Sequence, residues 1–204
     1  MKFIDNNNTV VVLGSWNVSI FTPDWVKKYI FNDIDVKAEI LLDSVFSIHL
    51  TADDFQIFVS PNRLAITNQN KDDDSFKEIQ DIVMKLADYL PHTPVSAFGI
   101  NFRVQVDEKT KIFEKAKLPF YKELVKKGTV DYEIKYTVNR GKSGQMTLNV
   151  SEKESICEFD VNFHFNIKKL ADLKQTLLND SESILDYKAK TEDVVLSLIR
   201  SCEE

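Results

Sequence analysis

The chain has 204 residues, of which 43% are hydrophobic and 28% are charged. Only five glycines and five prolines occur in this length, which excludes a low-complexity or disordered chain and predicts an ordered globular protein. The formal net charge of −6 disfavours general binding to polyanions, and two cysteines are too few for a disulfide framework or a four-cysteine metal site.

The N-terminal residues predict a cytoplasmic protein. The stretch MKFIDNNNTVVVLG contains one lysine, one aspartate and three asparagines, and it has no apolar run long enough for a signal peptide or a membrane span. We therefore expect no membrane association.

The first half of the chain predicts a strand, a helix and a three-stranded meander. Residues 10–21 are rich in β-branched and aromatic residues, which favours a strand. Thr22 followed by Pro23 is typical of a helix start, and we expect that helix to end near Phe31. The meander strands are predicted over residues 36–50, 55–60 and 64–68.

The clearest helical pattern follows. Ser75 and Glu78 match a capping box, and apolar residues recur at helical spacing as far as Leu90. The acidic run 72–74 stands at the positive end of this helix, so we interpret it as a helix-start device and not as a metal cluster.

The second half predicts a similar order of elements. A long strand over residues 97–106 alternates apolar and polar side chains, and Gly99 on its polar side favours a bulge over a close backbone approach. A helix is predicted over residues 109–127, broken near Pro119. Three alternating strands and two helices then follow, over residues 130–138, 146–150, 157–167, 168–178 and 183–200.

This order predicts an α+β fold made of two pseudo-repeated units. Each unit reads strand, helix, three-stranded meander, helix, with an antiparallel sheet covered by helices on one face. The first unit spans residues 1–92 and the second spans residues 93–204, with an extra C-terminal helix. We expect the two units to form one compact body.

Catalytic sequence motifs are absent. The chain has no phosphate-binding P-loop, no dinucleotide-binding glycine motif, no nucleophile elbow, no HExxH and no pair of CxxC motifs. The sequence therefore predicts no cofactor and favours a function without catalysis.

The last predicted strand carries a polar face. Glu158, Asp160, Asn162 and His164 recur at two-residue intervals, and residues 131–135 are possible cross-strand neighbours. Carboxylates beside an imidazole could bind a divalent cation or act in acid–base catalysis. A solvated face of an antiparallel sheet carries such residues without being a site, and we favour this second interpretation.

Positive charge is concentrated in one stretch. Residues 109–142 contain ten lysines and arginines against four acidic residues, with Phe113, Phe120 and Tyr121 between them. Such a stretch could contact nucleic-acid phosphates, although the acidity of the whole chain disfavours this. We prefer lysines that meet the acidic surface of another copy.

The main hypothesis is therefore a non-enzymatic binding or assembly protein. We expect it to bind a protein partner, or to bind itself as a homo-oligomer, through a polar sheet face and opposed charged surfaces. The predicted binding residues are Asn101, Arg103, Lys135, Asp160 and His164. Two alternatives stay open: a metal-assisted hydrolase or nuclease that uses Asp160 and His164, and a nucleic-acid adaptor that uses residues 109–142.

Overall fold

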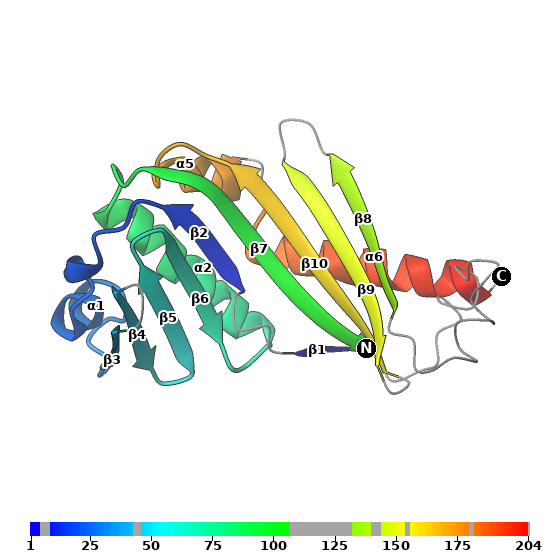
Figure 1. Cartoon of the computed structure of the whole chain (residues 1–204), viewed down its shortest axis with the longest axis horizontal. Helices are drawn as coiled ribbons and strands as arrows, with labels where there is room; N and C mark the ends of the chain where they lie inside the picture. The colour runs from blue at the N-terminus through cyan, green and yellow to red at the C-terminus, as the bar shows by residue number, and fades with distance from the viewer. Residues whose placement is uncertain are drawn as a thin grey trace.

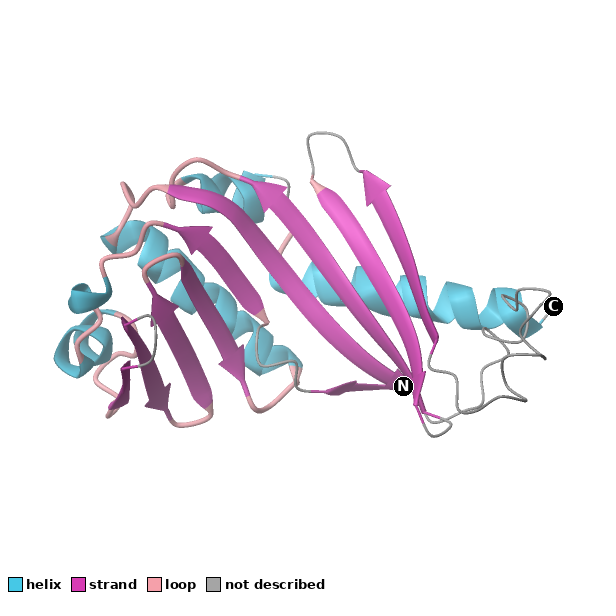
Figure 2. Cartoon of the chain, viewed as in Figure 1, coloured by secondary structure: helices cyan, strands magenta, loops and turns pink. Residues whose placement is uncertain are grey.

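The computed structural model describes residues 1–4, 9–42, 46–106, 132–139, 144–153, 156–179 and 182–203. These residues form a mixed fold in which a large antiparallel sheet packs against helices (Figures 1 and 2). The predicted α+β class is confirmed at this level. Among the described residues, no helix is long and apolar enough to cross a membrane.

The sheet contains ten described strands. Their bounds are β1 Lys2–Ile4, β2 Val10–Gly14, β3 Lys37–Leu42, β4 Phe46–Ala52, β5 Phe55–Ser60, β6 Arg63–Asn68, β7 Val95–Val106, β8 Tyr132–Asn139, β9 Gln145–Lys153 and β10 Ile156–Asn166. The order across the sheet is β3-β4-β5-β6-β2-β7-β10-β9-β8, and β1 also pairs with β7. The predicted strand over residues 36–50 is thus two antiparallel strands, β3 and β4, in which Leu42 pairs with Phe46.

The centre of the sheet is the long strand β7. On one side it pairs with β10 from Ala97 to Val106, and on the other side it pairs with β2 and then with β1. The remaining strands of the first half lie beyond β2, and those of the second half lie beyond β7 (Figure 1). Both halves of the chain therefore meet at the β2–β7 pair. A repeat between the halves, and a boundary after residue 92, stay predictions.

Four α-helices are described, and the local signals at the first two are clear. Their bounds are α1 Pro23–Tyr29, α2 Asp73–Tyr89, α5 Asp172–Lys174 and α6 Ile184–Glu203, with a 3-10 helix at Val18–Ile20 and a π-helical turn at Gln175–Asn179. The Thr22 side chain accepts a hydrogen bond from the Trp25 amide at 3.2 Å, which confirms the predicted start of α1. The predicted capping box of α2 is wrong, because Asp72 is the N-cap and accepts from the Ser75 amide at 2.8 Å.

The core lies between the sheet and helices α2 and α6. Alternate residues of β7 and β10 are buried on this side, as their sequence pattern predicts. Phe102 of β7 contacts Phe76 of α2, with ring centroids 5.5 Å apart. Phe163 of β10 contacts Tyr187 of α6, with ring centroids 4.8 Å apart. Helix α2 thus covers the first half of the sheet, while α6 covers the second (Figure 2).

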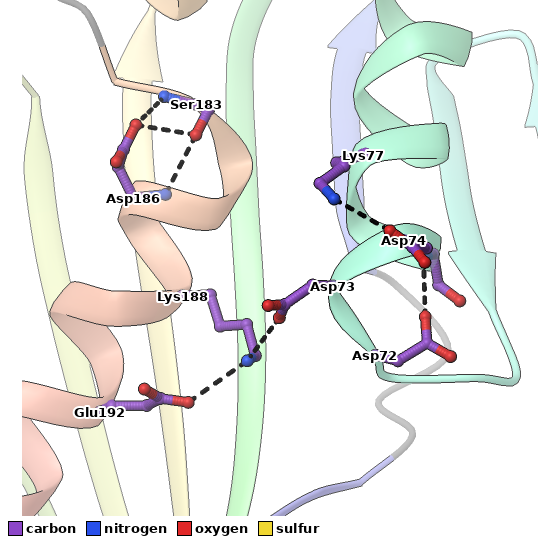
Figure 3. Close-up of polar contacts among 9 residues, drawn as sticks. Asp72, Asp73, Asp74, Lys77, Ser183, Asp186, Lys188 and Glu192 are labelled. Atoms are coloured by element: carbon purple, nitrogen blue, oxygen red, sulfur yellow. Dashed lines mark hydrogen bonds and ion pairs between the residues drawn. The ribbon is translucent and has the colours of Figure 1, made fainter.

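The acidic run at the start of α2 also ties the two long helices together. The Lys188 ammonium on α6 donates to Asp73 at 2.9 Å and lies 3.3 Å from the Glu192 carboxylate (Figure 3). Burial lowers the pKa of Lys188, but these two carboxylates outweigh it, so the net pKa is raised. With Asp72 as the N-cap, residues 72–74 act as the helix-start device that the sequence predicts.

Candidate binding face

The sheet face opposite the helices is polar along β7, β10 and β9. We call this the polar face, and its side chains alternate with the core residues of the same strands. They are Asn101, Arg103, Gln105, Thr147, Asn149, Ser151, Glu158, Asp160, Asn162 and His164, all half-buried because neighbouring strands shield one another.

An ion pair lies at the centre of the polar face. Arg103 of β7 stands directly opposite Asp160 of β10 in the strand register. The guanidinium donates from Nε to Oδ1 at 2.6 Å and from Nη2 to Oδ2 at 3.2 Å. The two side chains are 37% and 39% exposed, so water screens the attraction between their charges and the pair adds little to the stability of the fold. The two hydrogen bonds hold both side chains in a fixed orientation.

Amide groups continue this row of contacts. Asn162 opposes Asn101 and donates a hydrogen bond from its side-chain amide to the Asn101 Oδ1. His164 opposes Gly99, and its Nε2 lies 3.3 Å from the Asn166 Oδ1. The predicted bulge at Gly99 is wrong, because the register with both neighbouring strands is continuous there. The register of β2 and β7 shifts instead between Leu13 and Gly14.

The next strand, β9, places Asn149 between two charged residues. Asn149 pairs with Asp160 on one side and with Lys135 of β8 on the other. Its Oδ1 is the one buried side-chain polar atom in the described part of the chain that has no hydrogen-bond partner. The expected contact between residues 131–135 and β10 is therefore wrong, because β9 separates β8 from β10. Residue 131 lies outside the described residues.

A cavity of about 330 Å³ opens in the polar face. Three of the five predicted binding residues, Asn101, Arg103 and Asp160, line it together. The other two do not, since Lys135 lies on the edge strand β8 and His164 lies one pair further along β10. Further lining residues are Val11, Arg63, Phe102, Thr147, Asn149, Val161 and Asn162.

The cavity offers a mixed set of hydrogen-bonding groups. Two guanidinium groups face a single carboxylate, and asparagine amides and a threonine hydroxyl complete the lining. Such a set suits main-chain amides or an acidic side chain more than it suits a cation, because the Asp160 carboxylate already accepts two hydrogen bonds from Arg103. Within the described residues, no group of three or more His, Cys, Asp or Glu side chains is placed to hold a metal ion.

The lining residues that the sequence did not indicate fall into two kinds. Thr147 and Asn149 occupy the polar positions of an alternating strand, so the alternation contained the signal for them. Arg63 follows a turn at the start of β6, and only the pairing of β6, β2 and β7 brings it to the cavity.

Of the lysine-rich stretch 109–142, the structure describes residues 132–139. Lys135 is exposed on β8, and the predicted helix over residues 109–127 lies outside the described residues. Comparison with known proteins gives no matching family model and no matching curated sequence.

Proposed function

We propose that the protein is a non-enzymatic binding protein, and that its polar face binds a protein partner. One observation carries this proposal: Asn101, Arg103 and Asp160 line one cavity in a sheet face that the described helices leave uncovered. The proposal keeps the cytoplasmic location and the two pseudo-repeated units that the sequence predicts. The two central strands, β2 and β7, each followed in the chain by a meander and a helix, support the two units.

The charge of the cavity supports a partner that presents carboxylate or carbonyl groups. Arg63, Arg103 and Asp160 are the charged residues among those that line the cavity, so this lining has a formal charge of +1 on a chain with net charge −6. Arginine is enriched in protein interfaces because its planar group donates several hydrogen bonds in a fixed geometry. Acidic side chains of a partner would complement the two guanidinium groups of this lining.

The test begins by finding the partner and then asks whether the polar face holds it. Tagged full-length protein is captured from its native cell in mild salt, with and without nuclease, and the partner is identified by mass spectrometry. Binding of that purified partner is then measured for the wild-type chain and for the exchange variant Arg103→Asp with Asp160→Arg. The exchange keeps an ion pair but reverses its direction, so we expect a similar unfolding temperature and weaker binding.

A control variant tests whether a charge change outside the polar face affects binding. Asp193→Lys changes a charge on the exposed surface of α6, away from the polar face, and is expected to leave binding unchanged. Equal partner binding by the exchange variant and the wild type contradicts the proposal. A partner lost on nuclease treatment supports the nucleic-acid adaptor instead, and a cation-dependent rise in unfolding temperature supports the metal-assisted hydrolase.

A further inference from the structure

A second cavity, of about 400 Å³, lies between α2, the end of α1 and the β4–β5 turn. Its floor is mainly apolar: the buried lining residues are Ile30, Phe31, Phe55 and Ile82, together with polar Asn68 and Ser75. We call it the acidic groove, because exposed carboxylates surround this floor: Asp53, Asp54, Glu78 and Asp81. An apolar floor with a charged rim is typical of a surface that receives an amphipathic segment.

The negative charge of the groove has little compensation nearby. Among the described residues, no side chain donates a hydrogen bond to, or forms an ion pair with, Asp53, Glu78 or Asp81. The one lysine that lines the groove, Lys85, donates to the Ile30 carbonyl at 2.8 Å and to the Asn32 side chain. Four carboxylates against one ammonium leave a negative potential that attracts a cationic partner.

An exposed apolar surface extends from the same end of the sheet. Ile34 lines the groove and is 40% exposed, and β3 begins three residues after it. Ile40 on β3 and Phe46 on β4 are 59% and 42% exposed, and both lie on the helix side, since Ile40 pairs with buried Ile48. Leu41 is also exposed, on the opposite face of β3, so four of the nine large hydrophobic residues that the described chain exposes lie in residues 34–46.

We propose that the acidic groove and this apolar end of the sheet bind residues 109–127 of a second copy of the chain. That segment, KTKIFEKAKLPFYKELVKK, holds seven lysines and two glutamates with aromatic and aliphatic residues between them. It thus combines the positive charge that the rim attracts with the apolar groups that the floor accepts. The contact is separate from the polar face, so it goes beyond the proposed binding of a protein partner.

The topology favours a segment from another copy over the segment of the same copy. Residues 109–127 are joined to the sheet through the end of β7 and the start of β8, and β8 is the edge strand opposite to β3 (Figure 1). Because the groove and the segment are different surfaces, the contact is head-to-tail, and it closes into a dimer only if both copies make it reciprocally.

The main test measures the mass of the full-length protein by sedimentation over a range of concentrations. The groove variant carries Glu78→Lys with Asp81→Lys, and the segment variant carries Lys115→Glu with Lys117→Glu. Each variant alone is expected to dissociate about tenfold more easily than the wild type, because like charges then meet at the contact. An equimolar mixture is expected to associate again, because the intact groove of one variant meets the intact segment of the other.

A second measurement uses a labelled synthetic peptide of residues 109–127. We expect the wild-type chain and the segment variant to bind it, more weakly at high salt, and the groove variant to bind it at least about tenfold less. Asp193→Lys serves as the control for a charge reversal outside the groove, and thermal unfolding confirms that each variant is folded. A wild-type chain that stays monomeric up to about 100 µM and does not bind the peptide overturns this inference.

The polar-face exchange variant distinguishes the two proposals. If it lost self-association while the groove variant kept it, the copies would meet through the polar face, and the groove inference would fail. If it lost only the protein partner, the two surfaces would act independently.

Discussion

Arg103 of β7 and Asp160 of β10 occupy opposite positions in the register, and two hydrogen bonds join their side chains. Because both side chains are more than a third exposed, we expect a small coupling energy of about 0.5–1 kcal/mol. Urea unfolding of the wild type, Arg103→Met, Asp160→Asn and the double variant gives this value as a double-mutant cycle. A coupling above about 3 kcal/mol would show that the pair stabilises the fold as a buried ion pair does.

Lys188 joins α6 to the start of α2 through Asp73, and the two residues are far apart in the sequence. Replacing Lys188 by methionine keeps its aliphatic packing and removes the charge, so we expect a loss of about 0.5–1 kcal/mol in the free energy of unfolding. Lys77→Met is the control, since Lys77 pairs only with Asp74 of its own helix among the described contacts. Equal losses for the two variants would mean that the contact between helices adds nothing.

Two glycines in neighbouring strands predict opposite outcomes on substitution by alanine. A Cβ at Gly14 would lie 2.5 Å from the Pro94 carbonyl oxygen and 2.8 Å from the Val95 Cγ1. A Cβ at Gly99 would lie 3.3 Å from its nearest neighbour, the movable side-chain amide of Asn162. We therefore expect Gly14→Ala to destabilise the protein by about 1–3 kcal/mol and Gly99→Ala to change it by less than about 0.5 kcal/mol.

Thermal and urea unfolding measure both glycine variants. A stable Gly14→Ala protein would mean that the chain around Pro94 moves away at low cost. A strongly destabilised Gly99→Ala protein would show that the amide contact between Asn101 and Asn162 is rigid.

Two helix starts make the stability depend on pH. The Ser75 amide lowers the pKa of Asp72. The hydroxyl and amide of Ser183 lower the pKa of Asp186 (Figure 3). A carboxyl whose pKa is lowered by folding stabilises the protein fully above its unfolded pKa of about 3.9. This contribution is lost as the pH falls through the lower, folded pKa.

The measurement compares the wild type with the variant Asp72→Ser and Asp186→Asn. Serine caps a helix without titrating, and an asparagine at position 186 keeps a side-chain oxygen that accepts from Ser183. We therefore expect the variant to lose less stability than the wild type between about pH 6 and about pH 2. Parallel pH curves would show that these two carboxylates do not contribute to acid unfolding.

Short-range patterns predicted most of the elements, and long-range pairing decided the rest. The alternation in β7 and β10 depends only on strand geometry, so it correctly separated buried Phe102 and Phe163 from polar Arg103 and Asp160. Arg103 and Asp160 are far apart in the sequence, and only the pairing of β7 with β10 makes them neighbours.

The wrong predictions have physical reasons of the same kind. Ser75 and Glu78 match a capping box, but Asp72, three residues earlier, accepts a hydrogen bond from the Ser75 amide and begins the helix there. Its negative charge also suits the helix start. A glycine within a strand often marks a bulge, which is why the sequence predicted one at Gly99. The strand is regular there because Gly99 pairs with β2 on one side and with β10 on the other. The exposed groups around the acidic groove come from three separate segments, so no local pattern indicated them.

The pairing of β2 with β7 has a consequence for any attempt to divide the chain. A fragment that ends after residue 92 would leave β2 as an open edge, and the fragment that starts at residue 93 would leave β7 open in the same way. Each open edge carries the hydrogen-bonding groups and apolar side chains that complete the other. Two such fragments, expressed together, should therefore associate through β2 and β7 and restore the native sheet. This property suits the chain to use as a split reporter.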